Sequence, residues 1–114
     1  MAFIDWDLAA PGARIHDVAH VCWQYLGLGP AVTDTGEAAR RVRLIADSYA
    51  LADRRPLVPT ILWWQDRCRR GIEDAADAGH PAMIRLRDAG VVTEVRRAYQ
   101  WVADRREVLE RALR

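Results

Sequence analysis

Apolar residues recur at intervals of three and four along most of the chain, and turn-forming residues interrupt them. The first such stretch extends from about Arg14 to Leu26. On one face it carries Ile15, Val18, Ala19, Cys22, Tyr25 and Leu26. Because this spacing is typical of an amphipathic helix, and because the GLGP segment of residues 27–30 disfavours its continuation, we predict a first helix over residues 14–26.

The pattern predicts two further long helices. Asp34 and Glu37 have the spacing of a capping box, in which the first side chain accepts from a free backbone amide and the second reaches back, so the second helix should start there and extend to about Leu51. The third should begin near residues 56–59, since proline is tolerated in a first turn, and continue to about Ala78.

The C-terminal third of the sequence predicts one short helix and one final helix. Pro81 should start the short helix and Gly90 should end it. Thr93 would then precede the final helix as its capping residue. The inward positions of that helix would be Val95, Tyr99, Val102, Leu109 and Leu113.

The N-terminus differs from the rest, because residues 1–6 are β-prone and the Ala-Ala-Pro-Gly segment of residues 9–12 then turns the chain. Six residues are too few for an isolated strand in water. The sequence shows no repeat and no interdomain linker. We therefore expect one all-α domain over residues 1–114, a bundle of about five helices with one short N-terminal β-strand.

Charge and composition exclude several classes of function. With 17 basic and 16 acidic residues the formal charge is +1, which disfavours binding to nucleic acid or to an anionic membrane. Every basic residue is arginine, so a mechanism that needs a lysine for a nucleotide phosphate cannot be completed from this sequence. There is no apolar run of about 20 residues and no signal-peptide pattern, so a cytoplasmic location is expected. Cys22 and Cys68 are expected to be reduced thiols.

The segment IDWDLAAPGARIHDVAH, residues 4–20, concentrates five acidic and imidazole side chains and so indicates a metal site. His16 and His20 are four residues apart, as in the zinc helix H-E-x-x-H. A catalytic zinc site normally takes three protein ligands, however, and Asp17 stands where that motif has the longer glutamate. Zinc is therefore the weaker interpretation.

The wider segment FIDWDLAAPGARIHDVAHVCWQYLGL resembles the pattern IDWD-A-x-x-G-x-R-x-x-D-L-A of the aminoglycoside and choline phosphotransferase family. The later segment RRVRLIADSYAL also resembles the next helix of that family. The resemblance covers essentially the whole chain and is strongest over residues 4–28. It implies the helical part of a kinase-like C-terminal lobe.

Position by position, the resemblance assigns roles to five residues. Asp5 matches the aspartate that binds the magnesium ion bridging the ATP phosphates. Asp7 is either near the same ions or a solvated turn residue. Asp17 matches a buried helical carboxylate that holds the catalytic loop through backbone hydrogen bonds. Gly12 and Arg14 match the turn between them, where glycine permits a tight backbone and arginine can pair with a carboxylate.

The same resemblance shows what this sequence does not contain. The catalytic motif H-G-D-x-x-x-x-N should lie about twenty residues before IDWD, and only four residues precede Asp5. The nucleotide lobe and its lysine are also missing. We therefore expect weak magnesium binding, ATP binding only if the missing lobe is supplied, and no useful rate from the chain alone.

Three functions remain open on sequence grounds: a partial phosphotransferase lobe completed by another half, a helical interaction or scaffold protein, and an unrelated helical enzyme. The second would be a homodimer through Phe3, Ile4 and Trp6, flanked by the first helix, because an unpaired strand favours pairing with a second copy. The acceptor substrate cannot be read from motifs. Four aromatic residues could line a pocket or belong to the core: Trp63, Trp64, Tyr99 and Trp101.

Overall fold

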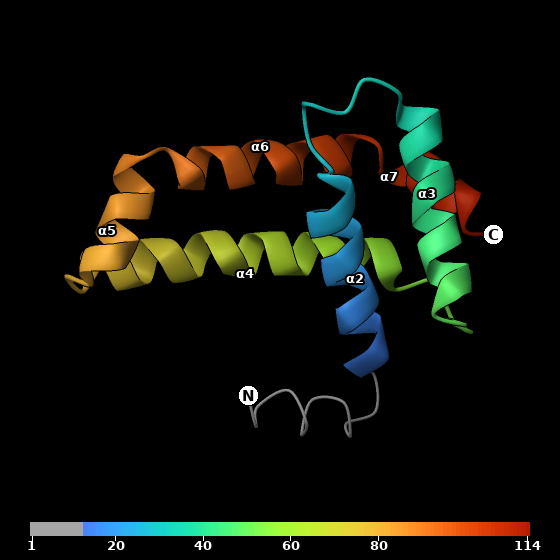
Figure 1. Cartoon of the computed structure of the whole chain (residues 1–114), viewed down its shortest axis with the longest axis horizontal. Coiled ribbons are helices and arrows are strands. Elements are labelled where there is room, and N and C mark those ends of the chain that lie inside the picture. The colour runs from blue at the N-terminus through green and yellow to red at the C-terminus, as the bar shows by residue number, and fades with distance from the viewer. Residues whose placement is uncertain (1–12) are drawn as a thin grey trace.

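The computed structural model describes residues 13–114, and these residues are helical with short connections. The helices, as labelled in Figure 1, are α2 (Ala13–Leu26), α3 (Thr35–Ser48), α4 (Leu57–Asp77), α5 (Pro81–Asp88), α6 (Val91–Asp104) and α7 (Arg106–Ala112). The expected helical class is therefore confirmed over this range. The expected N-terminal strand lies outside the described residues.

The helices form a flat and open arrangement. α4 and α6 run side by side in opposite directions, with α5 joining them at one end, while α2 crosses α4 and α3 packs against α2 and α7 (Figure 1). The principal extents are 44 × 36 × 17 Å, so the molecule is about two helices thick at most. Its radius of gyration is 15.0 Å, against about 13 Å for a compact domain of this length.

The core lies where α2, α3, α4 and α7 meet. Its fully buried side chains come from all four helices and include Val18, Val42, Ile61 and Leu109. Each helix contributes one apolar face, as the spacing of three and four predicts. None of the helices between residues 13 and 114 is both long and apolar enough to span a membrane.

The start of α3 confirms half of the predicted capping box. The Asp34 carboxylate accepts a hydrogen bond from the Glu37 backbone amide at 3.0 Å. The Glu37 carboxylate does not reach back, because it is hydrogen-bonded to Arg40 and Arg41 one turn further along. Two guanidinium groups are stronger partners for a carboxylate than one backbone amide.

The prediction of one final helix starting after Thr93 is wrong in two respects. α6 already starts at Val91, directly after Gly90, whose positive φ of 87° ends the preceding turn, and Thr93 lies inside the helix. The chain then breaks at Arg105. The Arg105 guanidinium lies 4.6 Å from the Trp101 ring and donates to the Thr35 hydroxyl at 3.3 Å. The break turns α7 onto α3.

Two tyrosines expected on inward faces, Tyr25 and Tyr99, are exposed. Tyr25 is 81% exposed, and Tyr99 is more than a third exposed. A phenol can keep its hydroxyl in water while its ring covers neighbouring atoms. The other expected inward residues of α6 and α7, such as Val102 and Leu109, are buried.

Candidate functional site

The residues predicted to hold magnesium, Asp5 and Asp7, lie outside the described residues, and so does Gly12. The magnesium site therefore stays a prediction. Arg14 and Asp17, the other two residues matched to the phosphotransferase pattern, lie on α2.

Arg14 connects the start of α2 to the end of α3. Its guanidinium donates a hydrogen bond to the backbone carbonyl of Tyr49, the residue that follows α3. Carbonyls at a helix C-terminus carry partial negative charge and attract cations. The sequence predicted a carboxylate partner for Arg14, whereas the partner among the described residues is a backbone carbonyl.

The expectation that Asp17 is buried is wrong for the described chain. Its neighbours Val18 and Ala19 are fully buried in the core, which turns Asp17 outward, and the residue is exposed. Among residues 13–114 the Asp17 carboxylate has no hydrogen bond or ion pair with another side chain.

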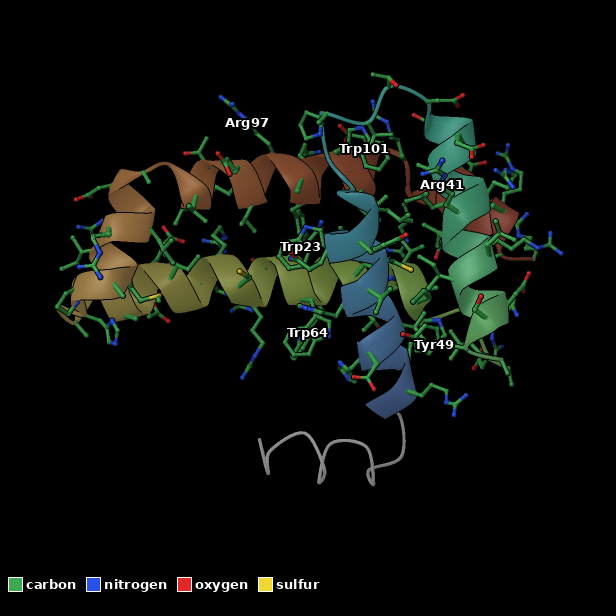
Figure 2. All side chains as sticks on the ribbon, viewed as in Figure 1. Trp23, Arg41, Tyr49, Trp64, Arg97 and Trp101 are labelled. Atoms are coloured by element: carbon green, nitrogen blue, oxygen red, sulfur yellow. The ribbon has the colours of Figure 1, made fainter. Side chains whose placement is uncertain are left out.

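Beside Asp17, α2 and α4 present a cluster of aromatic and imidazole rings, which we call the α2–α4 face: His16, His20, Trp63 and Trp64. The Trp64 indole N–H donates to His16 Nδ1 at 3.0 Å. The rings of Trp63 and Trp64 meet edge to face at 4.9 Å, and His20 lies 6.3 Å from Trp64. Trp64 points away from α6, toward the N-terminal half of α2 (Figure 2).

The contacts of His16 are those of a packed structural side chain. His16 Nδ1 accepts a hydrogen bond, so the proton of the neutral ring is on Nε2 in this arrangement. Across the part of the chain that the structure describes, no group of three or more histidine, cysteine, aspartate or glutamate side chains is placed to hold a metal ion. His16 contacts both tryptophans edge to face, as in a structural aromatic cluster.

The α2–α4 face is partly open to solvent. Trp63 is 43% exposed, and the Arg67 guanidinium lies 5.3 Å from its ring centre. An arginine over an exposed tryptophan stabilises the ring in place by a cation–π interaction. Of the four aromatics that sequence left open, Trp101 is core, Trp63 and Trp64 belong to this face, and Tyr99 lies apart on α6.

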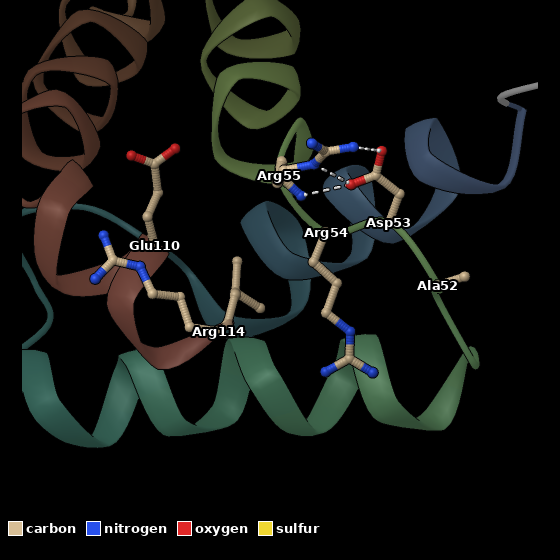
Figure 3. Close-up of a pocket in the computed structure, with 7 residues that line it drawn as sticks. Ala52, Asp53, Arg54, Arg55, Glu110 and Arg114 are labelled. Carbon is tan, nitrogen blue, oxygen red and sulfur yellow. Dashed lines mark hydrogen bonds and ion pairs between the residues drawn. The ribbon is translucent and has the colours of Figure 1, made fainter.

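A depression of about 690 Å³ lies between the α3–α4 connection and α7 (Figure 3). Arg54, Arg55 and Arg114 line it, which suggests an anion site. Two of these charges are already neutralised, however: Arg54 pairs with Asp47 at 2.5 Å and Arg55 with Asp53 at 2.9 Å. The depression is therefore a weak candidate for phosphate binding.

The two cysteines are free thiols, as predicted. Cys22 is fully buried, and burial raises the pKa of its thiol to about 12. Burial also raises the pKa of the half-buried Cys68. Because the thiolate is the reactive form, neither thiol is activated as a nucleophile.

Comparison with protein-family models, with curated proteins and with solved structures finds no match. The likeness to the phosphotransferases therefore remains a resemblance of sequence pattern.

Proposed function

We propose that this chain is a partial, kinase-like phosphotransferase lobe of the aminoglycoside and choline type, which requires a complementary segment for catalysis. The reaction of the completed lobe would be ATP-dependent transfer of a phosphoryl group to a small molecule. The proposal starts from the pattern around Asp5, Gly12, Arg14 and Asp17, which resembles the family at matched positions.

The exposed Asp17 beside the α2–α4 face is the observation that carries the proposal. In the family pattern this carboxylate accepts hydrogen bonds from the backbone of the catalytic loop. An exposed carboxylate that has no side-chain partner among residues 13–114 is compatible with a lobe that lacks this loop.

The open shape of the molecule gives independent support. A radius of gyration above the value for a compact domain means that its helices share less surface with one another than they could. Helices in such an arrangement gain free energy by packing against another segment, since apolar area is then removed from water. The α2–α4 face would be part of that contact.

The residues present determine which catalytic groups this chain would supply and which the complementary segment would supply. Asp5 and Asp7 would supply carboxylates to magnesium, the hard ion that such oxygens bind. The complementary segment would supply the lysine and the H-G-D-x-x-x-x-N motif, which do not occur in the 114 residues. Because phosphoryl transfer depends on all these groups together, neither part should be active alone.

The test is reconstitution. The chain is co-expressed with the preceding part of an aminoglycoside phosphotransferase, cut just before its own IDWD-like segment, and complex formation and magnesium-dependent ATP turnover are measured. We expect a complex with measurable turnover that Asp17→Asn and Trp63→Ser weaken. Leu86→Ser on α5, an exposed position on a helix without contacts to α2, is the matched control and should have no effect.

Two results would contradict the proposal. One is micromolar binding of ATP and magnesium by the chain alone in calorimetry, about −8 kcal/mol, which would require a complete site within the 114 residues. The other is a complex that forms equally well with Asp17→Asn, Trp63→Ser and the Leu86→Ser control, because the α2–α4 face would then not be the contact.

The second candidate function is a scaffold that acts as a homodimer, and the exposure of Trp63 on the α2–α4 face favours it as well. Its predicted strand contacts, Phe3, Ile4 and Trp6, lie outside the described residues. Light scattering at several concentrations separates the two functions. A dimer that is lost on deletion of residues 1–7 supports the scaffold function, whereas a monomer at every concentration excludes it.

A further inference from the structure

The His16 ring on α2 lies against two tryptophans of α4, and one of them depends on it for a hydrogen bond. The Trp64 indole N–H donates to His16 Nδ1 at 3.0 Å, in a half-buried hydrogen bond. The His16 ring also meets Trp63 and Trp64 edge to face, at 5.4 and 5.6 Å between ring centres. Because an indole N–H is a donor only, this hydrogen bond requires a lone pair on Nδ1.

The lone pair on Nδ1 exists only in the neutral imidazole. Both nitrogens of a protonated histidine ring carry hydrogen, and both are then donors. Protonation of His16 therefore places two N–H groups opposite each other where one hydrogen bond had been. Rotation of the ring by half a turn does not restore an acceptor, because it brings a carbon-bound hydrogen to the same place. This contact between α2 and α4 thus exists in one protonation state of His16 only.

The charged and titratable groups around the pair come from three helices. They are Arg67 on α4, Arg14, Asp17 and His20 on α2, and Asp47 and Tyr49 at the end of α3. Arg67 lies 5.3 Å from the Trp63 ring centre. Arg14 donates to the Tyr49 backbone carbonyl, and Asp47 is paired with an arginine of the α3–α4 connection. Guanidinium groups have no acceptor, so neither of these two arginines can replace Nδ1 as the partner of the indole.

The two remaining groups lie on α2 beside His16. Asp17 is exposed, since its neighbour Val18 is the residue turned into the core. His20 lies 6.3 Å from the Trp64 ring, and its ring nitrogens also become donors when it is protonated. Both imidazoles next to Trp64 therefore lose their acceptor nitrogen on protonation.

We propose that the His16–Trp64 pair is a pH-dependent switch at the contact between α2 and α4. Above the range in which imidazoles titrate, about pH 5 to 8, the His16 ring accepts from Trp64 and holds the start of α2 on α4. As the pH falls through that range, the hydrogen bond is lost and the indole N–H turns toward water. Val18 and Cys22, which are fully buried further along α2, keep the rest of the helix in the core.

The switch would change the α2–α4 face in two ways. Its aromatic rings would be less firmly held at low pH, and protonated His16 would add positive charge to a face that already carries Arg67. This proposal does not rest on the phosphotransferase function, because both members of the pair belong to this chain and their contact can be measured on the chain alone.

The composition of the chain makes the switch measurable. The sequence contains three histidines: His16, His20 and His80. Histidine is the side chain that ordinarily changes its charge between about pH 5 and pH 8. Burial raises the pKa of the Cys22 thiol to about 12 and also raises the pKa of Cys68, so the thiols do not titrate in this interval. A change at Trp64 can therefore be assigned by substituting single histidines.

The experiment is heteronuclear NMR on the full isotope-labelled chain, from about pH 8 to about pH 5. It measures the scalar coupling between Trp64 Nε1 and His16 Nδ1 across the hydrogen bond, and the titration of the His16 ring nitrogens. We expect the coupling at the upper pH and its loss at the lower pH. The Trp64 N–H resonance should move with the same midpoint as the His16 ring.

Two variants assign the effect. His16→Gln keeps a side-chain oxygen as acceptor at every pH, so the Trp64 resonance should no longer change over the interval. His20→Gln, one turn further along α2 and also beside Trp64, is the matched control and should retain the transition.

The coupling and the ring titration are both observed in the parent chain, so the test holds even if His16→Gln does not fold. The proposal is overturned if the His16 ring does not titrate in this interval, or if the coupling persists once the ring is protonated. It is also overturned if the Trp64 transition survives in His16→Gln or disappears in His20→Gln.

Discussion

The hydrogen bond from Trp64 to His16 should couple α2 to α4 energetically. It is 3.0 Å long and half-buried, and it joins residues 48 positions apart. A neutral hydrogen bond contributes about 0.5–1.5 kcal/mol net, and partial exposure places this one in the lower half of that range. Trp64→Phe removes the donor, and His16→Phe removes the acceptor, while both leave an aromatic ring for the edge-to-face contact at 5.6 Å.

The assay is a double-mutant cycle, in which the free energy of unfolding in urea is measured for the parent chain, both single variants and the double variant. Each single variant also changes packing, but the cycle subtracts that part. We expect a coupling energy of about 0.5–1 kcal/mol. Additivity of the two substitutions within about 0.3 kcal/mol would refute the reasoning, because the hydrogen bond would then contribute nothing in solution.

Three further predictions concern the fold. Asp34→Ala should lower the free energy of unfolding by about 1 kcal/mol through loss of the α3 cap, whereas Thr33→Ala at the preceding exposed position should not, as thermal unfolding would show. Leu109→Ala should cost about 2–5 kcal/mol in urea unfolding because it opens a cavity between α7 and α3, against little change for the exposed Val108→Ala. Hydrogen bonds from two arginines lower the pKa of the Glu37 carboxyl from 4.5 to about 2. The contribution of this carboxylate to the free energy of unfolding is therefore complete above pH 4.5 and is lost as the pH falls toward 2. Glu37→Gln should make the free energy of unfolding less dependent on pH over that interval.

Helix positions could be predicted from sequence because local rules govern them. Pro81 and Gly90 set the bounds of α5, and the Asp34 cap starts α3, as the spacing of residues indicated. The break at Arg105 could not be predicted in this way. At the break, Arg105 contacts Thr35, which lies 70 residues away, and no local pattern contains such a contact.

Long-range contacts also limit how far the candidate functional residues could be predicted from sequence. Helical spacing brought His16 and His20 to one side of α2, but it could not reveal that Trp64 would hold the His16 ring. Gln65 lies three residues after Leu62 and four after Ile61, so the spacing of apolar residues places it on the inward face of α4. The Gln65 side chain is fully buried there. Local spacing thus indicates which residues are buried, whereas it does not contain the partner of a side chain from another helix.

The long-range contact between α7 and α3 also has a consequence for the order of folding. α4, α5 and α6 are consecutive in the chain and contact one another, so this hairpin closes only short loops as it forms. The docking of α7 on α3 must instead close a loop that contains the whole hairpin, at a larger entropic cost. During synthesis on a ribosome, α2 and α3 therefore emerge early. Part of their apolar surface stays exposed to solvent until the last residues of α7 have been synthesised.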